Sequence, residues 1–189
     1  MGTGAAPADV LLVASAPGAA EDALGRPLAG AGAELLDAAL GDTGIAATDV
    51  CVTALVKCLP PGGRDPSPSE VVNCSEHLAA EVELVRPVVV VALGGFVTKL
   101  LRGDHAPIRE RRGREEPRRL GSVTFWLLPT FHPAAALYAP ALVEQLRADL
   151  ARLPDLVLRG RPEIEDGALP EPEAVAGPGQ LELFGTGPS

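Results

Sequence analysis

The apolar positions of this chain form two kinds of pattern that alternate along the sequence. Continuous apolar runs predict buried strands, and the run at 87–93 is so rich in valine that we expect helices to cover both of its faces. Between the runs, apolar residues at helical spacing predict helices. The expected strands are 9–15, 49–56, 87–93 and 122–128, and the expected helices are 30–41, 95–101, 140–153 and one that runs from a Ser67 cap to about Val85. This alternation predicts an α/β protein, a three-layer α/β/α sandwich whose central, mainly parallel sheet is four-stranded.

Composition divides the chain into a domain and a tail. After Leu158 the periodic pattern gives way to Pro, Gly and Glu, so we expect a domain over 1–158 and a disordered acidic tail over 159–189. The net charge is −9, and the residues from Arg161 onward contribute −5 of it through six acidic residues and one arginine. Hydrophobic residues make up 47% of the chain but aromatic residues only 3%, so Ala, Val, Leu and Gly must build the core.

Signals for membrane insertion and export are missing from the sequence. No stretch approaches the roughly 20 apolar residues of a membrane-spanning helix. The first residues lack the basic start and long apolar region of a secretory signal. The three cysteines are an odd number, which agrees with reduced thiols in a cytosol. We therefore expect a cytoplasmic, monomeric protein with no membrane partner.

The loop after the first expected strand has the composition of a ligand-binding loop. Ala16-Pro17-Gly18 forms a turn with few side chains, and the acidic pair Glu21-Asp22 follows it. Such a turn lets a ligand approach the backbone at the carboxyl end of a strand, where open α/β sheets bind their ligands. On these residues alone, an ordinary strand-to-helix connection is the simpler explanation.

One segment of the chain is rich in arginine. Residues 102–119 hold seven arginines against four acidic residues, a local charge of +3. Cationic side chains release counterions from DNA phosphates, so this segment could bind DNA despite the negative net charge of the whole chain. A solvated loop of mixed charges is the alternative. The residues that we expect to contact phosphates are Arg109, Arg111, Arg112 and Arg114.

Four later segments occur in an order that is typical of one family. They are VTALVKCLPP at 52–61, Cys74, RPVVVVALG at 86–94 and PTFHPAA at 129–135. Together with the first loop they resemble the uracil-DNA glycosylase superfamily, specifically the iron–sulfur type called family four, over residues 9–153. The resemblance implies a DNA repair enzyme that turns a base out of the duplex and hydrolyses its N-glycosidic bond.

The resemblance also implies roles for residues of this chain. Glu21 matches an acidic position of the first loop and would position or polarise the water. His132 matches the histidine of a His-Pro motif and would stabilise the departing base. Without the resemblance, Glu21 fits a surface carboxylate and His132 fits a structural histidine that fixes its loop. The implied base pocket consists of Ser15, Ala16, Pro17, Gly18, Asp22, Leu28 and Ala54.

Several positions depart from the family pattern. A glutamate of the first loop is Ser15 here, and the aromatic residue that would stack on the base is Leu28. The asparagine of the second strand is Ala54, so an amide that could pair with the edge of uracil is missing. In the next loop Gly63 replaces an asparagine, while Arg64 is retained as a further expected DNA contact. Two functions therefore fit: a glycosylase for a deaminated or damaged base, or a catalytically inactive module that binds DNA or lesions.

The cysteines bear on whether the chain holds an iron–sulfur cluster. Cys58 and Cys74 match two of the four cluster ligands that the resemblance implies, and the upstream Cys-x-x-Cys has no counterpart in this sequence. A four-iron cluster needs four ligands, usually thiolates. Cys51 falls on an expected strand and fits a core position better than a ligand position. We expect no metal or other cofactor, and a cluster only where the missing ligands are supplied.

The end of the tail carries a short motif of its own. Gln180-Leu181-Glu182-Leu183-Phe184 resembles the peptide with which bacterial replication and repair proteins bind the sliding clamp. Gln180 offers polar contacts, and Leu181, Leu183 and Phe184 offer apolar anchors for a pocket. A tail that folds back onto an exposed patch of its own domain is the alternative. The expected partners are therefore DNA and the sliding clamp.

Overall fold

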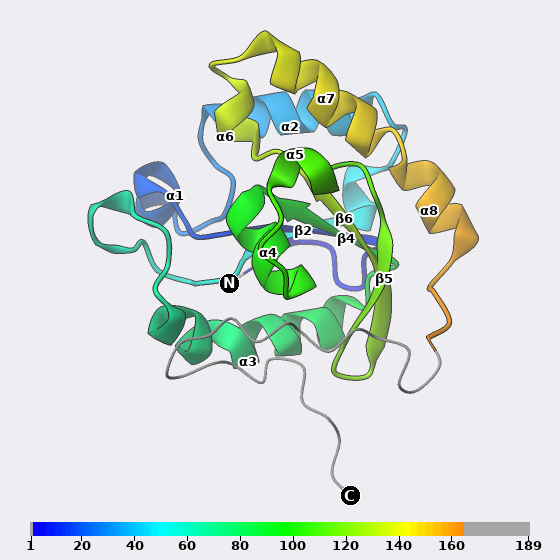
Figure 1. Cartoon of the computed structure of the whole chain (residues 1–189), viewed down its shortest axis with the longest axis horizontal. Helices are drawn as coiled ribbons and strands as arrows, with labels where there is room; N and C mark the ends of the chain where they lie inside the picture. The colour runs from blue at the N-terminus through cyan, green and yellow to red at the C-terminus, as the bar shows by residue number, and fades with distance from the viewer. Residues whose placement is uncertain (1, 165–189) are drawn as a thin grey trace, which may run out of the picture.

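A six-stranded sheet lies between two layers of helices in the computed structural model, which describes residues 2–164 (Figure 1). The strand order is β1-β3-β2-β4-β6-β5. The four predicted strands are β2 (Val10–Ala14), β3 (Val50–Ala54), β4 (Val89–Leu93) and β6 (Val123–Thr130), and they are parallel to one another. This confirms the predicted α/β sandwich and its mainly parallel sheet.

The sheet has two strands more than the four that we expected. β1 (Thr3–Gly4) and β5 (Glu116–Leu120) are antiparallel edge strands, paired with β3 and β6 respectively. β1 is too short to leave a pattern in the sequence. β5 has the sequence EPRRL, with one buried residue, because an edge strand can keep charged side chains and a proline that an inner strand excludes. The arginine-rich segment therefore ends in a strand.

The long helices lie close to their predicted positions. They are α2 (Ala31–Gly41), α3 (Pro68–Val85), α4 (Gly95–Arg102) and α7 (Pro140–Leu150). The predicted Ser67 cap is confirmed: the Glu70 backbone N–H donates to the Ser67 hydroxyl at 3.4 Å, and the Glu70 carboxylate accepts from the Ser67 backbone N–H at 2.7 Å. The shorter helical elements were not expected from the sequence. They are α1 (Ala19–Leu24), α5 (Ile108–Arg111), α6 (Pro133–Ala136), α8 (Leu153–Arg159), η1 (Ala47–Asp49) and η2 (Pro61–Gly63).

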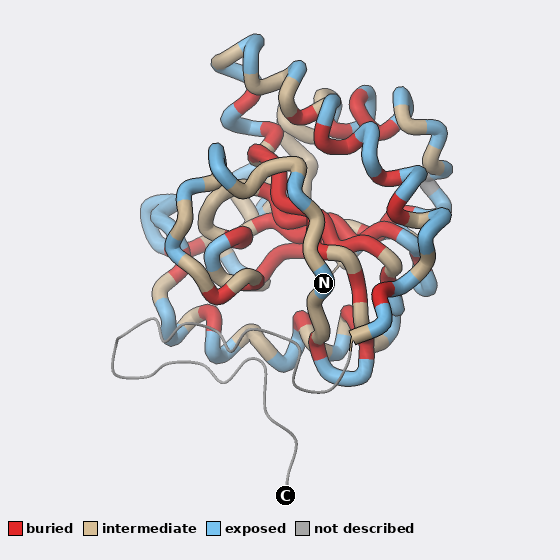
Figure 2. The backbone as a smooth tube through the Cα atoms, turned by 45° about the vertical axis from the view of Figure 1, so that its right-hand side comes forward, coloured by how far each residue is buried: buried red, intermediate tan, exposed pale blue. Residues whose placement is uncertain are grey.

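Two apolar layers hold the helices onto the sheet. Leu78 and Val82 of α3 pack on one face with Val97 of α4. Leu36 of α2 packs on the other face, together with leucines of α7 and α8. Figures 1 and 2 show this arrangement, with α3 on one side of the buried strands and α2 and α7 on the other. Within the described residues, no helix is long and apolar enough to span a membrane.

The topology brings four loops to one edge of the sheet. The chain leaves the carboxyl end of β2 toward α2 on one face, and it leaves the carboxyl end of β4 toward α4 on the other. In open α/β sheets the crevice at such a switch between neighbouring strands is where ligands bind. The loop after β3 and the turn after β6 reach the same edge, because all four strands are parallel. This edge carries the candidate site.

Residues 160–164 lie at the opposite edge of the sheet. The indole N–H of Trp126 donates to the Gly160 carbonyl at 2.9 Å, and the Arg161 guanidinium donates to the Pro87 carbonyl at 3.3 Å, just before β4 begins. Arg119 donates to the Ile164 carbonyl at 3.1 Å. The first residues of the tail that we expected to be disordered are thus held on the domain at the amino ends of the strands.

Candidate active site

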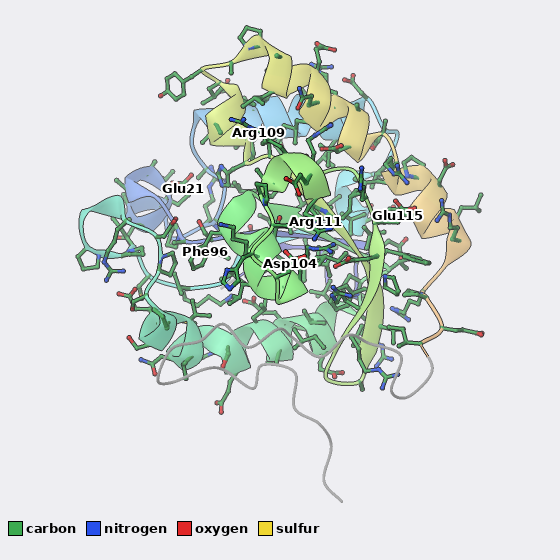
Figure 3. The ribbon with its side chains drawn as sticks, in the orientation of Figure 1. Glu21, Phe96, Asp104, Arg109, Arg111 and Glu115 are labelled. Atoms are coloured by element: carbon green, nitrogen blue, oxygen red, sulfur yellow. The ribbon has the colours of Figure 1, made fainter. Side chains whose placement is uncertain are left out.

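Glu21 closes the loop between α1 and α2. It lies in the first turn of α1, a six-residue helix rather than the irregular loop that we expected, and its Oε1 accepts hydrogen bonds from the backbone N–H groups of Ala29 at 3.2 Å and Gly30 at 3.1 Å (Figure 3). A Cβ on Gly18 would lie 2.7 Å from the other carboxylate oxygen, so a larger residue there would displace the Glu21 carboxylate. Partial burial raises the pKa of Glu21, but these backbone donors outweigh it and hold the pKa below its usual value. The carboxylate is therefore ionised near neutral pH.

His132 follows β6 and caps α6. Its Nδ1 accepts a hydrogen bond from the Ala134 backbone N–H at 3.2 Å, which leaves Nε2 as the protonated nitrogen and an N–H donor. Burial lowers the pKa of His132, and the negative charge of Glu21 acts in the opposite direction without cancelling that effect. The imidazole is thus neutral near pH 7, and the structure brings it within electrostatic reach of Glu21. Gly94, with φ of +94°, makes room for it: a Cβ there would lie 3.3 Å from that of His132.

A pocket of about 260 Å³ lies beside Glu21, between α1 and the end of β3. This volume is slightly below the ~300–1,000 Å³ of typical small-molecule sites and suits a ligand as small as a nucleobase. Of the predicted pocket residues, Pro17, Asp22 and Ala54 line it, as does Glu21. The lining does not include His132 or the predicted residues Ser15, Ala16, Gly18 and Leu28. The full lining is Pro17, Glu21, Asp22, Gly25, Arg26, Pro27, Thr53, Ala54, Val56 and Lys57.

Leu28 serves the core rather than the pocket. It is half-buried and packs against the apolar layer that contains Leu12 and Leu36. Its φ of +48° is unusual for a residue other than glycine, and such backbone strain gathers near functional sites. The position that the family pattern assigns to a base-stacking aromatic residue therefore holds a side chain that anchors the loop.

The wall of the pocket near Ala54 is polar, but its donors are already used. The Lys57 ammonium donates to the Thr53 hydroxyl at 2.8 Å, to the Ala54 carbonyl at 2.8 Å and to Glu81 at 2.6 Å. An ammonium has three N–H groups, so these bonds saturate it. The Thr53 hydroxyl in turn donates to Glu81 at 2.5 Å. Burial raises the pKa of Glu81, and the hydrogen bonds from Lys57 and Thr53 more than offset it and lower the pKa.

Sequence reasoning did not assign this lysine network to the site. Thr53 and Lys57 flank Ala54 at the end of β3, so their places next to a predicted pocket residue were the available signal. The third partner, Glu81, comes from the middle of α3 and carries no local signal at all. Because the network is saturated, neither Lys57 nor Thr53 has a side-chain donor left for a base.

The predicted phosphate-contacting arginines fall into two groups. Arg109 and Arg114 are exposed and form no ion pair with any residue of the described chain. Figure 3 labels Arg109. Arg111 pairs with Asp104 at 3.1 Å, and Arg112 pairs with Asp149 at 2.7 Å. The charges of the second group are thus used inside the protein, which the arginine count could not show.

Arg64 is engaged as well. Its guanidinium donates to both carboxylate oxygens of Glu70, each at 2.8 Å. The hydrogen bonds from Arg64 and from the Ser67 backbone hold the pKa of Glu70 to about 2. Arg64 remains an exposed residue, so a phosphate would have to compete with Glu70 for it.

An exposed apolar corner lies next to the histidine turn and was not expected from the sequence. Leu137 and Tyr138 follow α6, and 89% of Tyr138 is exposed. Proteins that distort DNA often insert apolar side chains between base steps. The signal in the sequence was the pair Leu-Tyr between two prolines, outside any helical face.

The cysteines do not fit a four-thiolate cluster within the described residues. Cys58 is exposed, Cys74 is half-buried and Cys51 is buried on β3. Across residues 2–164, no group of three or more His, Cys, Asp or Glu side chains could hold a metal ion. We therefore derive no chemical step through a cluster. The predicted clamp-binding residues Gln180, Leu181, Leu183 and Phe184 lie outside the described residues.

Comparison with known proteins identifies the family of this chain. The family model described as "Uracil DNA glycosylase superfamily" matches residues 1–154. A protein named type-4 uracil-DNA glycosylase from Archaeoglobus fulgidus is 34% identical over 170 residues, which cover 87% of this chain and 85% of that protein. Another of the same name from Pyrobaculum aerophilum is 38% identical over 146 residues, or 75% of this chain and 74% of that protein. A type-5 uracil-DNA glycosylase from Pyrobaculum aerophilum is 51% identical over 53 residues, or 28% of this chain and 23% of that protein.

Proposed function

Because this chain belongs to the uracil-DNA glycosylase superfamily, we propose that it is a DNA base-excision repair enzyme that hydrolyses the N-glycosidic bond of a deaminated or damaged base. The observation that carries this proposal is an ionised Glu21 that lines a pocket of nucleobase size and lies within electrostatic reach of a neutral His132. Breaking the bond leaves positive charge on the sugar and negative charge on the departing base. A carboxylate and an N–H donor are the groups that stabilise those two charges.

The protonation states match the two roles. In the proposed mechanism Nε2–H of His132 donates a hydrogen bond to an oxygen of the departing base as negative charge develops there. The Glu21 carboxylate, held by the Ala29 and Gly30 N–H groups, attracts the sugar cation and orients the attacking water. Water supplies a hydroxyl to the sugar carbon and a proton to the base, which completes the hydrolysis. Neither group has to change its protonation state before the bond breaks.

A non-catalytic module that binds DNA or lesions is the second candidate, and one observation favours it. The pocket wall at Ala54 offers no side-chain donor for the edge of a base, since the three N–H groups of Lys57 are already used. A wall that offers no donor to the edge of a base contributes little to discrimination among bases. Such a module would keep the fold and the exposed arginines and lack the chemistry.

A panel of oligonucleotides separates the two candidates. Duplexes and single strands that contain uracil, hypoxanthine or xanthine are incubated with the protein in excess, and abasic sites are revealed by alkaline cleavage. A glycosylase releases at least one of these bases, whereas a binding module retains the DNA and releases none. Undamaged DNA of the same sequence is the control.

The exposed arginines should govern DNA affinity. Replacing Arg109 and Arg114 with alanine is expected to weaken binding to all sequences alike, because arginines without a groove-reading helix contact phosphates. Each lost phosphate contact should lower the slope of log K against log salt by about 0.9. The measurement is a fluorescence anisotropy titration at several salt concentrations.

The matched control for this experiment is Arg147→Ala. Arg147 is also a partly exposed arginine, but it pairs with Asp42 and belongs to α7. The Arg147→Ala substitution should leave the slope of log K against log salt unchanged. An unchanged slope in the Arg109/Arg114 variant would show that DNA contacts a different surface.

We also propose that the C-terminal peptide binds the sliding clamp. Residues 160–164 are held at the side of the sheet opposite the pocket, so the domain and the peptide could bind their partners together. A synthetic peptide of residues 176–189 should bind the clamp, and replacing Leu183 and Phe184 with alanine should abolish binding, because a few apolar anchors carry the affinity of short peptides. Isothermal titration calorimetry measures both. If the unaltered peptide does not bind the clamp at high micromolar concentration, the clamp is not its partner. If the two alanines lower the Tm of the full chain, the tail packs on its own domain.

A further inference from the structure

An ion pair with a buried carboxylate joins the arginine segment to α7. Asp149 of α7 is only 3% exposed. Its carboxylate accepts from Arg112 Nε at 3.1 Å and from a terminal guanidinium nitrogen of Arg112 at 2.7 Å, a bidentate arrangement. That same nitrogen also donates to the Gln145 carbonyl at 2.7 Å. Arg112 is therefore held at two places on one helix.

The same carboxylate reaches the strand that ends at the histidine. The Thr130 hydroxyl donates to Asp149 at 2.7 Å, and Thr130 is the last residue of β6. The Arg112 guanidinium lies over the Phe131 ring, 5.7 Å from its centre. Thr130 and Phe131 directly precede His132 in the chain. The Arg112–Asp149 pair thus contacts Thr130 and Phe131, the two residues that directly precede His132.

The backbone at Gly113 tightens this junction. The Gly113 N–H donates to the Pro129 carbonyl at 2.9 Å, which ties the arginine segment to β6 a second time. A Cβ on Gly113 would lie 2.4 Å from Asp149 Oδ1, and its φ is +66°, so both sterics and backbone conformation require glycine. The segment around Arg112 can therefore not shift without moving either Asp149 or the end of β6.

A pair in this position is costly to bury. Desolvation raises the pKa of Asp149, and the Thr130 hydrogen bond and the charge of Arg112 do not offset it fully. Apolar residues of similar size often stabilise a core as well as a buried ion pair does. The cost is consistent with a role beyond stability, and the two elements that the pair connects suggest which role.

We propose that Arg112 and Asp149 couple the DNA-contacting segment to the catalytic turn, so that Asp149 is a positioning residue for His132. The inference rests on the proposed function, since it needs DNA at Arg109 and Arg114 and chemistry at His132. Arg112 lies between those two exposed arginines in the chain. A phosphate bound at either of them would fix the Arg112 segment, and the buried pair would carry that constraint to Thr130, Phe131 and the imidazole that follows. DNA contact and correct placement of Nε2–H then occur together.

The test compares Arg112→Lys and Asp149→Asn with the unaltered chain. Arg112→Lys keeps the charge but loses the bidentate fork, and Asp149→Asn keeps an acceptor for Thr130 but loses the charge. Both should slow single-turnover base release by about a hundredfold, the cost of displacing a catalytic group by roughly 1 Å. Affinity for undamaged DNA should fall by less than the rate does. Arg147→Met, which breaks an ion pair on the same helix away from the histidine, should change neither.

A spectroscopic readout keeps the inference independent of activity. The chain has three histidines, so the His132 resonances can be assigned by single substitution and followed by NMR. In the unaltered chain, DNA should shift these resonances. In Arg112→Lys and Asp149→Asn, the DNA-induced shift should be lost. The pKa of His132 should also rise in both variants toward its ordinary value of about 6.5, because the turn loosens. Glu21, the charged group that acts on His132, is unaltered in every variant.

The outcomes separate this inference from the proposed function. An unaltered chain that releases no base but shows the coupled NMR response contradicts the glycosylase and supports the coupling. An active chain whose pair variants retain the rate and the His132 titration overturns the coupling alone. If a single variant unfolds, the double variant Arg112→Met/Asp149→Asn replaces it. This double variant removes both charges of the pair and keeps an acceptor for Thr130. The rate of base release and the titration of His132 are then measured on the double variant.

Discussion

Replacing His132 with alanine is expected to slow base release by about a hundredfold or more, and replacing Glu21 with glutamine by a similar factor. Groups that donate to, or place charge near, the reacting atoms contribute about 10²-fold or more to the rate. Glutamine can still accept the Ala29 and Gly30 hydrogen bonds through its carbonyl, so Glu21→Gln removes the charge while the loop stays closed. The measurement is single-turnover release of the preferred base from a radiolabelled or fluorescent oligonucleotide.

A matched variant separates chemistry from helix capping at position 132. His132 caps α6 through Nδ1, so alanine removes the cap as well as the donor. Asparagine is a good cap and lacks the imidazole N–H. His132→Asn should therefore retain the Tm of the protein and lose the rate. A His132→Asn protein that retains the full rate would show that the histidine serves only as a cap.

The pH profile of base release follows from the same two groups. Burial lowers the pKa of His132 below 6.5, so the imidazole stays neutral until the pH falls through that lowered value. The pKa of Glu21 is also lowered, from 4.5, so its carboxylate keeps its charge through the neutral range. The rate should therefore be constant near neutral pH and fall on the acid side, where His132 becomes protonated. A rate that rises as the pH falls below 6.5 would contradict a neutral histidine as the donor.

The central fold could be predicted because its elements carry complete local signals. β4 is an unbroken apolar run, and the Ser67–Glu70 capping box marks the start of α3. The missing elements lack such signals for physical reasons. β5 is an edge strand that tolerates Pro117 and two arginines, and α1 buries no residue at all. Patterns of burial cannot reveal elements that are not buried.

The site was predictable only where one residue acts alone. Glu21 and His132 follow strand ends, so their convergence at one edge of the sheet follows from parallel topology. The state of the arginines depends on partners far along the chain: Arg112 on Asp149 and Arg111 on Asp104. Counting charges in a segment cannot tell a free guanidinium from one that is already paired. The saturation of Lys57 by Glu81 is a long-range feature of the same kind.

Restoring an amide to the pocket should sharpen base discrimination. Ala54 lies at the end of β3, lines the pocket and is 5% exposed, so Ala54→Asn places a donor and an acceptor where the structure now has a methyl group. Each hydrogen bond to a matching base edge contributes about 0.5–1.5 kcal/mol net. Uracil offers the N3–H donor and the O4 acceptor, and cytosine reverses both, so two such bonds should raise binding of uracil over cytosine by roughly tenfold or more. Competition binding with short single strands that carry one uracil or one cytosine measures the ratio, and it requires no catalysis.

The control for Ala54→Asn must fill the same space without hydrogen bonds. Leucine has the branched shape of asparagine, with methyl groups in place of the amide oxygen and nitrogen, so Ala54→Leu should lower binding of both bases and leave their ratio near one. If asparagine and leucine give the same ratio, the wall at position 54 does not face the edge of the base. The saturated Lys57 would then border a part of the pocket that the base does not reach, and discrimination would have to come from the backbone of the loop that Glu21 closes. If the expected ratio is observed, base selectivity at the end of β3 depends on an amide side chain, which Ala54 does not provide.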